Sequence, residues 1–257
     1  MATNGASEPL AVVTGASSGL GEVFARDLVK RGYSVLAVAR REDRLKKLAA
    51  ESGGSVEPLV ADLGTSAGLD AVVRRVSERG GADLLVNNAG FATYGKFLDS
   101  PVEREIGQLR LNVEAVVVLT SRLTPAMVKR GSGGVIFIAS ALGFGAVPFF
   151  ASYGATKAFI LNFSQALAFE LQGSGVKIHV VCPGPIKTEF YAVSNSQKTV
   201  ASAPMATPEK IAETALDAWS AGKVMAIPGA PNRILTFLPR ILPRSTMRSI
   251  MASMMKP

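Results

Sequence analysis

The chain has 257 residues, of which 48% are hydrophobic and 25 are glycine, a composition that fits a packed domain with tight turns. Its formal net charge is +8, yet six of its 28 basic residues and none of its 20 acidic residues follow Asp217. The charge therefore belongs mainly to the C-terminal end, which argues against the evenly basic surface of a nucleic-acid-binding protein.

The first expected element is an apolar run over residues 9–14, which by its length and flanks predicts a buried strand. Gly15, Gly19 and Gly21 follow it. Apolar residues then recur at helical spacing as far as Lys30, with a further glycine placed to end the helix. A strand, a glycine turn and a helix let backbone amides and a helix N-terminus approach a pyrophosphate, so the sequence indicates a dinucleotide-binding turn.

The second strand is expected over residues 34–39, and Arg40 and Arg41 follow it directly. Dinucleotide-binding folds that use NAD place an acidic residue at this strand end, whereas an arginine there accommodates the 2′-phosphate of NADP. The pair therefore favours NADP, with Arg40 the stronger candidate. The alternative is that the two arginines simply begin the charged helix expected over residues 42–51.

Strands and helices continue to alternate, with no linker or low-complexity segment between them. Residues 100–103 are typical of a capping box with Pro101 at the first helical position, and they open a helix that runs past Asn112 towards Arg130. This alternation predicts an α/β fold: one Rossmann-like domain over residues 1–230, with a doubly wound parallel sheet of about seven strands and helices on both faces. The other strands are expected at 56–61, 83–86, 134–139, 176–182 and 224–227, and the other helices at 66–79, at 152–172 and from 207 onward.

Ligands of such sheets bind at the carboxyl ends of the strands. The polar and glycine residues that follow the expected strands all fall at that edge: Gly15, Arg40, Asp62, Asn87, Ser140 and Pro183. The sequence therefore places one ligand site there.

The sixth expected strand holds the only cysteine, Cys182, and the only histidine, His179. A single cysteine excludes an internal disulfide and fits a reducing compartment. A single histidine in a strand pattern argues against a Ser-His-Asp hydrolase and a histidine-rich metal site, and no metal is expected. Because the sequence shows no run of 18 apolar residues and no signal-peptide pattern, a cytoplasmic protein is expected.

Residues 187–206 show little periodicity, which favours a mobile lid over the pocket. Thr207 is placed to cap the next helix. Residues 231–257 are expected to form a basic amphipathic tail, because methionine and isoleucine recur at helical spacing opposite Arg244 and Arg248. Packing on its own subunit or on a dimer partner is one interpretation of this tail, and contact with an anionic membrane surface is the other.

Tyr153 and Lys157 stand four residues apart, which on a helix puts both side chains on one face. A phenol has an ordinary pKa near ~10, and a neighbouring ammonium group lowers it. The pair can therefore act as a general acid and base on a carbonyl or an alcohol. Taken alone, a tyrosine and a lysine at this spacing are more often an ordinary surface pair. The other motifs of the chain favour the catalytic interpretation instead.

With these residues in place, the chain resembles the short-chain dehydrogenase/reductase family over roughly residues 8–230, and most of all its bacterial NADP-dependent oxidoreductases of undefined substrate. The resemblance implies NADP(H) as cofactor and a catalytic tetrad of Asn112, Ser140, Tyr153 and Lys157. The cofactor contacts that it implies are Gly15, Ser17, Ser18, Gly19, Leu20, Gly21, Arg40, Arg41, Asp62, Leu63, Asn88, Ala89, Gly90, Tyr153, Lys157, Pro183, Gly184, Ile186 and Thr188.

By this resemblance, Tyr153 gives a proton to the carbonyl oxygen as hydride arrives, or takes one in the reverse reaction. Lys157 lowers the pKa of Tyr153 and holds the nicotinamide ribose, while Ser140 orients the substrate oxygen. Asn112 shapes its helix so that a water can link Lys157 to solvent. A homodimer or homotetramer through the helices that contain Asn112 and Tyr153 would be usual for the family.

The substrate is left open, although the residues flanking the expected pocket are apolar. They favour a hydrophobic ketone, aldehyde or secondary alcohol over a sugar phosphate, and steroid, fatty, aromatic and acyl-carrier substrates all remain candidates. The rival interpretation is a non-catalytic NADP-binding regulatory or membrane-surface protein of the same fold. The expected pocket residues are Leu142, Phe144, Phe149, Phe150, Phe91 and Tyr94.

Overall fold

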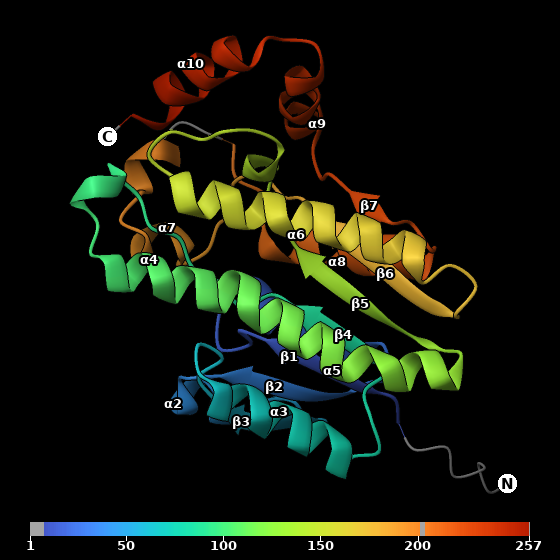
Figure 1. The fold of residues 1–257 in the computed structure, drawn as a ribbon. Helices are drawn as coiled ribbons and strands as arrows, with labels where there is room; N and C mark the ends of the chain where they lie inside the picture. Colours follow the sequence, from blue (N-terminus) through green and yellow to red (C-terminus); the bar gives the residue numbers. More distant parts are fainter. Residues whose placement is uncertain (1–7, 201–203, 257) are drawn as a thin grey trace, which may run out of the picture.

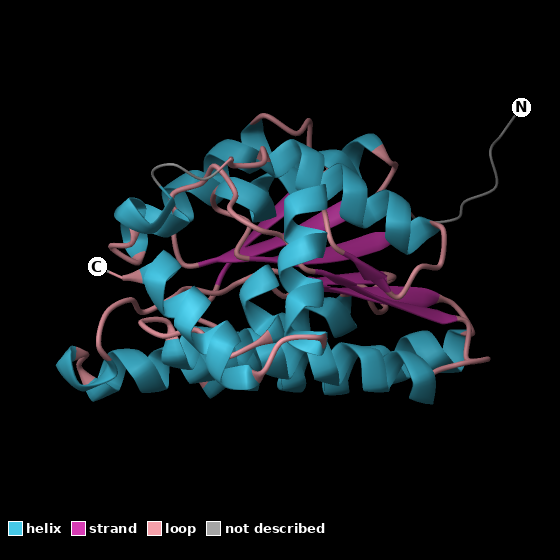
Figure 2. Cartoon of the chain, turned by 90° about the horizontal axis from the view of Figure 1, so that it is seen from above, coloured by secondary structure: helices cyan, strands magenta, loops and turns pink. Residues whose placement is uncertain are grey.

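The computed structural model describes residues 8–200 and 204–256. Its centre is a seven-stranded parallel sheet with the order β3-β2-β1-β4-β5-β6-β7, and helices cover both faces (Figure 1 and Figure 2). The predicted doubly wound α/β fold is therefore confirmed, and strand bounds differ from the expected ones by no more than two residues. The strands are β1 (Leu10–Thr14), β2 (Ser34–Ala39), β3 (Val56–Val60), β4 (Leu84–Asn87), β5 (Gly133–Ile138), β6 (Val176–Val181) and β7 (Met225–Ala226).

The strand residues divide their side chains between two apolar layers, because successive residues of a strand point to opposite faces. Val12 packs in the layer under α3, α5 and α6, and Val13 packs in the layer under α1, α2 and α8. Both valines are fully buried, as expected for a parallel sheet covered on both faces. The α-helices are α1 (Gly19–Lys30), α2 (Glu42–Ala50), α3 (Ser66–Glu78), α4 (Val102–Leu109), α5 (Ala115–Arg130), α6 (Ala151–Glu170), α7 (Phe190–Val193), α8 (Pro208–Ser220), α9 (Ala230–Phe237) and α10 (Arg244–Met255).

The helical segment from Val102 to Arg130 is long and apolar enough to cross a membrane by length and composition. In the fold it is a core helix, because Val116, Leu119 and Leu123 are buried against the sheet. It is continuous from α4 to α5 through a π-helical turn at Arg110–Glu114, which the sequence pattern did not indicate.

The predicted capping box at residues 100–103 is wrong. Pro101 has an extended ψ of 131° and takes the N-cap position of α4, and no side chain caps that helix. Ser100 is therefore one residue too early to act as the cap. The prediction for Thr207 is confirmed, since its hydroxyl accepts a hydrogen bond from the backbone N–H of Lys210 at 3.3 Å.

The segment expected as a mobile lid, residues 187–206, contains α7 and a 3₁₀ turn at Gln197–Val200, while its residues 201–203 lie outside the described part. A β-bridge between Ile186 and Ala206 joins its two ends. Its mobility stays a prediction.

The tail packs on its own chain. Helices α9 and α10 lie above the end of α6 in Figure 1, and the described structure buries Met247 and Met251 of α10 beside Phe150 and Tyr153. The hydroxyl of Tyr94 donates a hydrogen bond to the carbonyl oxygen of Met255 at 3.0 Å. The inner side of the tail thus belongs to the same packed unit as the sheet, and the boundary after residue 230 stays a prediction.

Candidate active site

The turn between β1 and α1 requires glycine at two positions. Gly15 has a φ of +68°, and a Cβ atom there would lie 2.9 Å from the Cα of Ala89. A Cβ atom on Gly21 would lie 2.3 Å from the carbonyl oxygen of Gly15 and 2.5 Å from Nδ2 of Asn88. The turn therefore presents bare backbone and the N-terminus of α1 at the carboxyl edge of the sheet, which fits a pyrophosphate group.

Thr14 and Asn88 fasten this turn to the loop after β4. The Thr14 hydroxyl accepts hydrogen bonds from the backbone N–H groups of Asn88 at 2.9 Å and Ala89 at 3.0 Å, and it donates to the carbonyl oxygen of Val86. The side-chain amide of Asn88 donates to the carbonyl oxygen of Thr14 at 2.8 Å. The predicted cofactor residues of these two segments are thus adjacent.

The two arginines after β2 differ in their contacts. Nε of Arg41 donates a hydrogen bond to the hydroxyl of Ser17 at 3.1 Å, and its Nη2 donates to the hydroxyl of Ser18. Nη1 of the same side chain pairs with Glu189 at 3.0 Å. Arg40 is exposed and has no hydrogen bond or ion pair within residues 8–200 and 204–256. The structure therefore brings Arg41, and not Arg40, against the glycine turn.

Asp62 and Leu63 follow β3 at the same edge. Oδ1 of Asp62 accepts a hydrogen bond from the backbone N–H of Gly64 at 3.0 Å, and Leu63 is buried. A Cβ atom on Gly68 would lie 2.0 Å from the carbonyl oxygen of Asp62, so α3 packs directly against this backbone. The exposed Asp62 carboxylate is thereby held in a fixed place.

Asn112 lies in the π-helical turn and is almost fully buried. Its Oδ1 accepts a hydrogen bond from the backbone N–H of Phe91 at 3.1 Å, and its Nδ2 donates to the carbonyl oxygen of Phe91 at 2.9 Å. Nδ2 also donates to the hydroxyl oxygen of Thr156, and the O–H of that hydroxyl donates to the carbonyl oxygen of Tyr153. A π-turn inside an α-helix often marks a functional position, and here it joins the loop after β4 to α6.

Ser140 follows β5 and caps a short 3₁₀ turn, η3 (Ala141–Phe144), by accepting a hydrogen bond from the backbone N–H of Leu142. Gly143 of this turn lies so close to α6 that a Cβ atom there would be 2.8 Å from the carbonyl oxygen of Lys157. This close approach fixes η3, and with it Ser140, against the helix that carries Tyr153, and Ser140 lies near enough to lower the pKa of Tyr153.

The pKa directions at Tyr153 and Lys157 differ from the expectation. Burial raises the pKa of Tyr153 and the nearby Tyr191 raises it further, while the hydrogen bond with Ser140 lowers it. Burial lowers the pKa of Lys157 to about 8. The predicted lowering of the tyrosine pKa by the lysine is therefore wrong for this geometry, because the Nζ of Lys157 donates to the carbonyl oxygen of Ile138 at 2.7 Å and lies 5.7 Å from the tyrosine ring centre.

Apolar side chains from distant parts of the chain cover Tyr153, which is only 7% exposed. The ring of Phe190 lies 5.5 Å from the ring of Tyr153, and that of Phe150 lies 6.0 Å from it. Met247 and Met251 of α10 complete this apolar cover. The sequence pattern identified the two methionines as one face of a helix but not as part of the site, and it gave no role to Phe190.

The six residues expected to line the substrate pocket do not all gather there. Leu142, Phe150 and Tyr94 belong to the cluster around Tyr153. Phe144 instead packs in the core layer under α5 and α6. Phe91 lies near Gly107 of α4, and Phe149, with a φ of 66°, lines a small depression beside Ser100 and Ser152.

The segment after β6 is held from two sides. A Cβ atom on Gly184 would lie 2.1 Å from Oδ1 of Asn232, which therefore packs at the end of β6. A Cβ atom on Gly19 would lie 3.1 Å from Cγ2 of Thr188. The predicted cofactor segment from Pro183 to Thr188 thus lies between the tail and the glycine turn.

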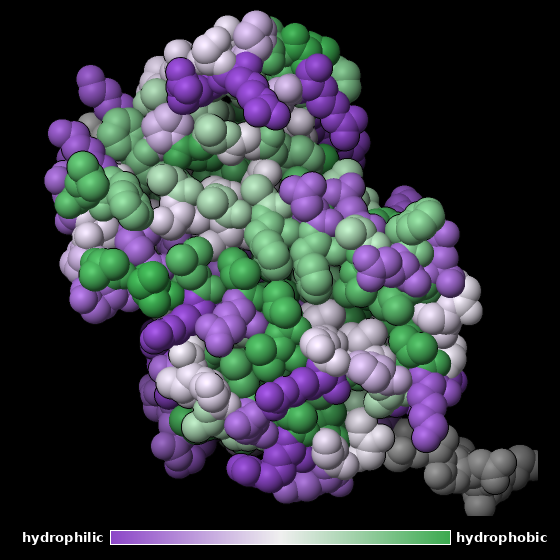
Figure 3. All heavy atoms as spheres, viewed as in Figure 1, coloured by the Kyte–Doolittle hydropathy of each residue, from purple (hydrophilic) through white to green (hydrophobic). Residues whose placement is uncertain are grey.

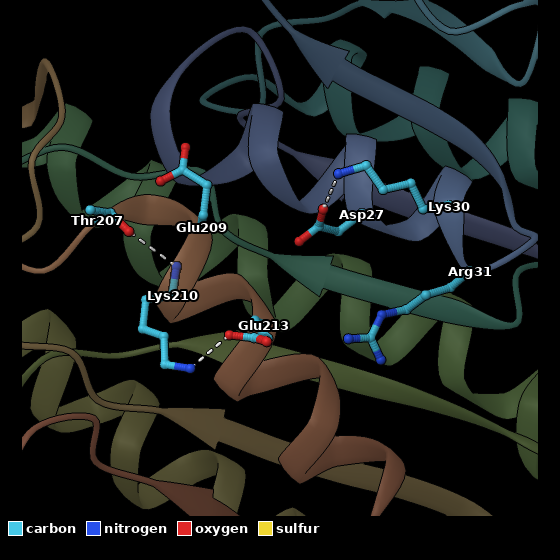
Figure 4. Close-up of a pocket in the computed structure, with 7 residues that line it drawn as sticks. All are labelled: Asp27, Lys30, Arg31, Thr207, Glu209, Lys210 and Glu213. Atoms are coloured by element: carbon cyan, nitrogen blue, oxygen red, sulfur yellow. Dashed lines mark hydrogen bonds and ion pairs between the residues drawn. The ribbon is translucent and has the colours of Figure 1, made fainter.

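A separate depression lies between α1 and α8 and contains none of the predicted site residues (Figure 4). Both cations and anions line it, and Lys210 and Lys30 are each paired with an acid of their own helix. Its mixed charge and its distance from the tetrad leave it outside the candidate site. The lining residues are Asp27, Lys30, Arg31, Thr207, Glu209, Lys210 and Glu213.

Comparisons with known proteins show which proteins this chain is similar to. A family model described as short chain dehydrogenase matches residues 9–199. A short chain dehydrogenase of Pseudocercospora fijiensis is 36% identical over 201 residues, which span 76% of this chain and 65% of that protein. An uncharacterized oxidoreductase of Myxococcus xanthus is 38% identical over 192 residues, 72% of this chain and 75% of that protein. The structure of a Sphingobium yanoikuyae short-chain dehydrogenase in complex with NADPH aligns with a TM-score of 0.81 at 35% identity, covering 86% of this chain and 88% of that one.

Proposed function

This chain belongs to the short-chain dehydrogenase/reductase family of oxidoreductases, and we propose that it interconverts a hydrophobic carbonyl compound and its alcohol with NADP(H), using Tyr153 as the general acid and base. The observation that carries the proposal is the proximity of Ser140 and Tyr153, which is close enough for the serine to lower the pKa of the buried phenol. This pair lies under an apolar cover, at the same sheet edge as a bare glycine turn.

The residues of the turn fit NADP. The two glycine positions that would clash with a Cβ atom leave room for close backbone approach to a pyrophosphate. Arg41, which already contacts Ser17 and Ser18, is placed to bind the 2′-phosphate, and Arg40 beside it is exposed and free to reach the same group. The NADPH held by the Sphingobium relative supports this assignment.

In the reducing direction the carbonyl carbon accepts a hydride, which NADPH supplies when bound, and the carbonyl oxygen takes the phenolic proton of Tyr153. The Ser140 hydroxyl orients that oxygen. Because burial raises the pKa of Tyr153, the phenol is kept protonated, which favours its role as a proton donor. Lys157, with a pKa of about 8, can gain and lose a proton near neutral pH and so restore the proton of Tyr153.

The substrate class follows from the cover. The side chains that cover Tyr153 are aromatic, aliphatic or thioether groups, while the charged group near it, Nζ of Lys157, belongs to its own helix and lies 5.7 Å from the ring centre. Methionines in such a cover adapt to irregular apolar shapes. A ketone, aldehyde or secondary alcohol with a bulky apolar body fits this surface better than a sugar phosphate.

The proposal is tested with a panel of apolar and phosphorylated carbonyls and alcohols, followed through nicotinamide absorbance with NADPH, NADH, NADP and NAD. We expect turnover of apolar substrates with the phosphorylated nucleotides. Arg41→Ala and Arg40→Asp should each weaken the binding of NADPH far more than the binding of NADH. A ratio of the two cofactor constants that barely moves in both variants would refute the 2′-phosphate assignment.

Assembly and location stay proposals. Exposed apolar residues on α4 and α6, including Val102, Ile106 and Phe169, support a homodimer or homotetramer through these helices. Light scattering of the purified protein tests this, and a strictly monomeric mass would overturn it. A cytoplasmic location likewise stays a prediction.

The outer side of the tail supports a second proposal, contact with an anionic membrane surface. Ile234, Phe237 and Ile241 are 64%, 53% and 63% exposed. The first two lie three residues apart on α9, and Ile241 follows the 3₁₀ turn at Leu238–Arg240; we call these three side chains the outer face of the tail. Arg240 and Arg244 flank this face, and no acidic residue follows Asp217. Figure 3 shows hydrophobic and hydrophilic atoms side by side at the corner where α9 leads into α10. A symmetric contact with a second copy of this face would oppose like charges, which favours an anionic lipid surface.

Vesicle sedimentation tests the membrane proposal. The protein should bind vesicles that contain phosphatidylglycerol and not vesicles of phosphatidylcholine alone. Ile234→Ser with Ile241→Ser should abolish binding, whereas Val60→Ser, at an exposed valine of β3, should not. Equal binding to both vesicle types, or no binding at all, would dispose of the proposal.

A further inference from the structure

The carboxylate of Glu189 holds two arginines that lie beside the glycine turn. Its Oε2 pairs with Nη1 of Arg41 at 3.0 Å, and its Oε1 pairs with Nη1 of Arg44 at 2.9 Å. These hydrogen bonds, with Arg41 first and Arg44 second, lower the pKa of Glu189, so the group is an anion at neutral pH. An internal carboxylate thus binds Arg41, the arginine proposed above for the 2′-phosphate, together with its neighbour Arg44.

Glu189 is also the N-cap residue of α7. The next residue, Phe190, packs its ring 5.5 Å from the ring of Tyr153, and the hydroxyl of Tyr191 raises the pKa of Tyr153. The carbonyl oxygen of Glu189 accepts the hydrogen bond from the backbone N–H of Val193 that closes this short helix. One carboxylate therefore joins the arginines after β2 to the aromatic cover of the catalytic tyrosine.

We propose that Glu189 is a specificity-determining residue that competes with the cofactor 2′-phosphate for Arg41 and Arg44, so that a 2′-phosphorylated nucleotide, and not its unphosphorylated counterpart, releases α7 from the arginines. A phosphate carries more charge and more acceptor oxygens than a half-exposed carboxylate, and it binds guanidinium groups in the same forked geometry. The inference rests on the proposed NADP preference.

Replacement of the Glu189 carboxylate by a 2′-phosphate at the arginines also affects how the substrate reaches Tyr153. While Glu189 holds both arginines, Phe190 lies over Tyr153, and the tyrosine is almost fully buried. Releasing the carboxylate removes the ion pairs that hold the start of α7. The nucleotide 2′-phosphate thereby opens the way to the catalytic phenol before the substrate binds.

The binding test uses 2′,5′-ADP and 5′-ADP as probes, measured by calorimetry on the full chain. Glu189→Gln keeps the side-chain size and removes the competing charge. It should lower the dissociation constant of 2′,5′-ADP by roughly three- to tenfold, which corresponds to the combined free energy of two partly exposed ion pairs. The dissociation constant of 5′-ADP should stay within about twofold of the wild-type value. Glu213→Gln on α8 is the matched control, because it removes the same charge from an exposed pair with Lys210.

Hydrogen exchange supplies a second readout that does not depend on turnover. Saturating 2′,5′-ADP should speed exchange of the backbone N–H groups of Val193, Ser194 and Ser196, which bond within the α7 segment. In Glu189→Gln these groups should exchange fast without any nucleotide. Slower or unchanged exchange in the wild type on binding 2′,5′-ADP would overturn the release of α7.

The binding outcomes separate the two proposals. If the wild type prefers 2′,5′-ADP but Glu189→Gln tightens it no more than Glu213→Gln does, the competition is refuted while the NADP preference stands. If neither the wild type nor Glu189→Gln distinguishes the two probes, the NADP preference fails and the competition fails with it.

Discussion

Two groups of side chains meet at Tyr153 and are held in different ways. The floor, which consists of Asn112, Ser140 and Lys157, is fixed by hydrogen bonds to backbone groups. The cover, which consists of Phe190, Met247 and Met251, is held by apolar packing. Directed bonds fix atoms to a fraction of an ångström, as proton transfer needs, whereas apolar packing tolerates changes of shape. In the proposed reaction, the floor serves proton transfer and the cover serves the choice of substrate.

The largest effect is expected at the residue that both groups touch. Tyr153→Phe removes the proton donor and leaves the aromatic contacts with Phe150 and Phe190 in place. Turnover should fall by at least about 10²–10⁴-fold, the usual contribution of a general acid. NADPH binding, measured by fluorescence titration, should stay within about twofold of the wild type. Substantial residual turnover would remove Tyr153 from its role.

A substitution that shifts the floor without altering a reacting group tests the difference between floor and cover more sharply. A Cβ atom on Gly143 would lie 2.8 to 3.1 Å from the backbone of Lys157 and Ala158, so Gly143→Ala must push η3 away from α6 and shift Ser140. We expect kcat to fall by roughly tenfold to a hundredfold, as for a displacement of about 1 Å.

Gly145→Ala is the matched control for that change, since the nearest atom to its Cβ would be Cγ of Pro239 at 3.9 Å. It should retain the wild-type kcat. Equal kcat values in the two variants would show that the approach of η3 to α6 does not position the serine.

A change in the cover should act on stability and on substrate size. Met251→Ala removes a buried thioether side chain and should lower the free energy of unfolding by about 2–3 kcal/mol. It should also lower KM for bulky substrates while kcat for small ones changes little. Met254→Ala, at an exposed position of the same helix, should stay within about 0.5 kcal/mol. A kcat loss for small substrates as large as that of Gly143→Ala would break the division between floor and cover.

The smallest effect concerns the pH dependence of stability. Burial lowers the pKa of Lys157 to about 8, so just above that pH the unfolded chain, with its ordinary lysine pKa, binds more protons than the folded one. The free energy of unfolding should therefore rise as pH increases from 8 to 9, by at most about 1.4 kcal/mol.

Lys157→Met should lack this rise in urea titrations across the same interval. Burial raises the pKa of Cys182 from an ordinary 9.0 to about 12 and also raises that of Tyr153, so both groups act in the opposite direction, Cys182 from about pH 8 upward. Because the variant and the wild type share these two groups, the difference between their curves reports Lys157. Parallel curves for the variant and the wild type would contradict the lowered lysine pKa.

The sequence predicted the floor better than the cover for physical reasons. Ser140 follows a strand, and Tyr153 and Lys157 are one helical turn apart, so short-range periodicity already places them at one edge of a parallel sheet. Phe190 and Met251 reach Tyr153 only through the packing of distant segments, which no local pattern encodes. The contact of Glu189 with Arg41 joins exposed side chains far apart in sequence, and the direction of the Tyr153 pKa depends on burial that periodicity cannot measure.

The bond between Tyr94 and the carbonyl oxygen of Met255 joins residues 161 positions apart. During synthesis at roughly 5–20 residues per second, the glycine turn and the tetrad leave the ribosome well before α10 is made. In that interval the aromatic cluster at Tyr153 lacks its two buried methionines and exposes apolar surface. We therefore expect the nascent chain to expose this apolar surface until α10 emerges, and a chain terminated within α10 to aggregate more readily than the full chain.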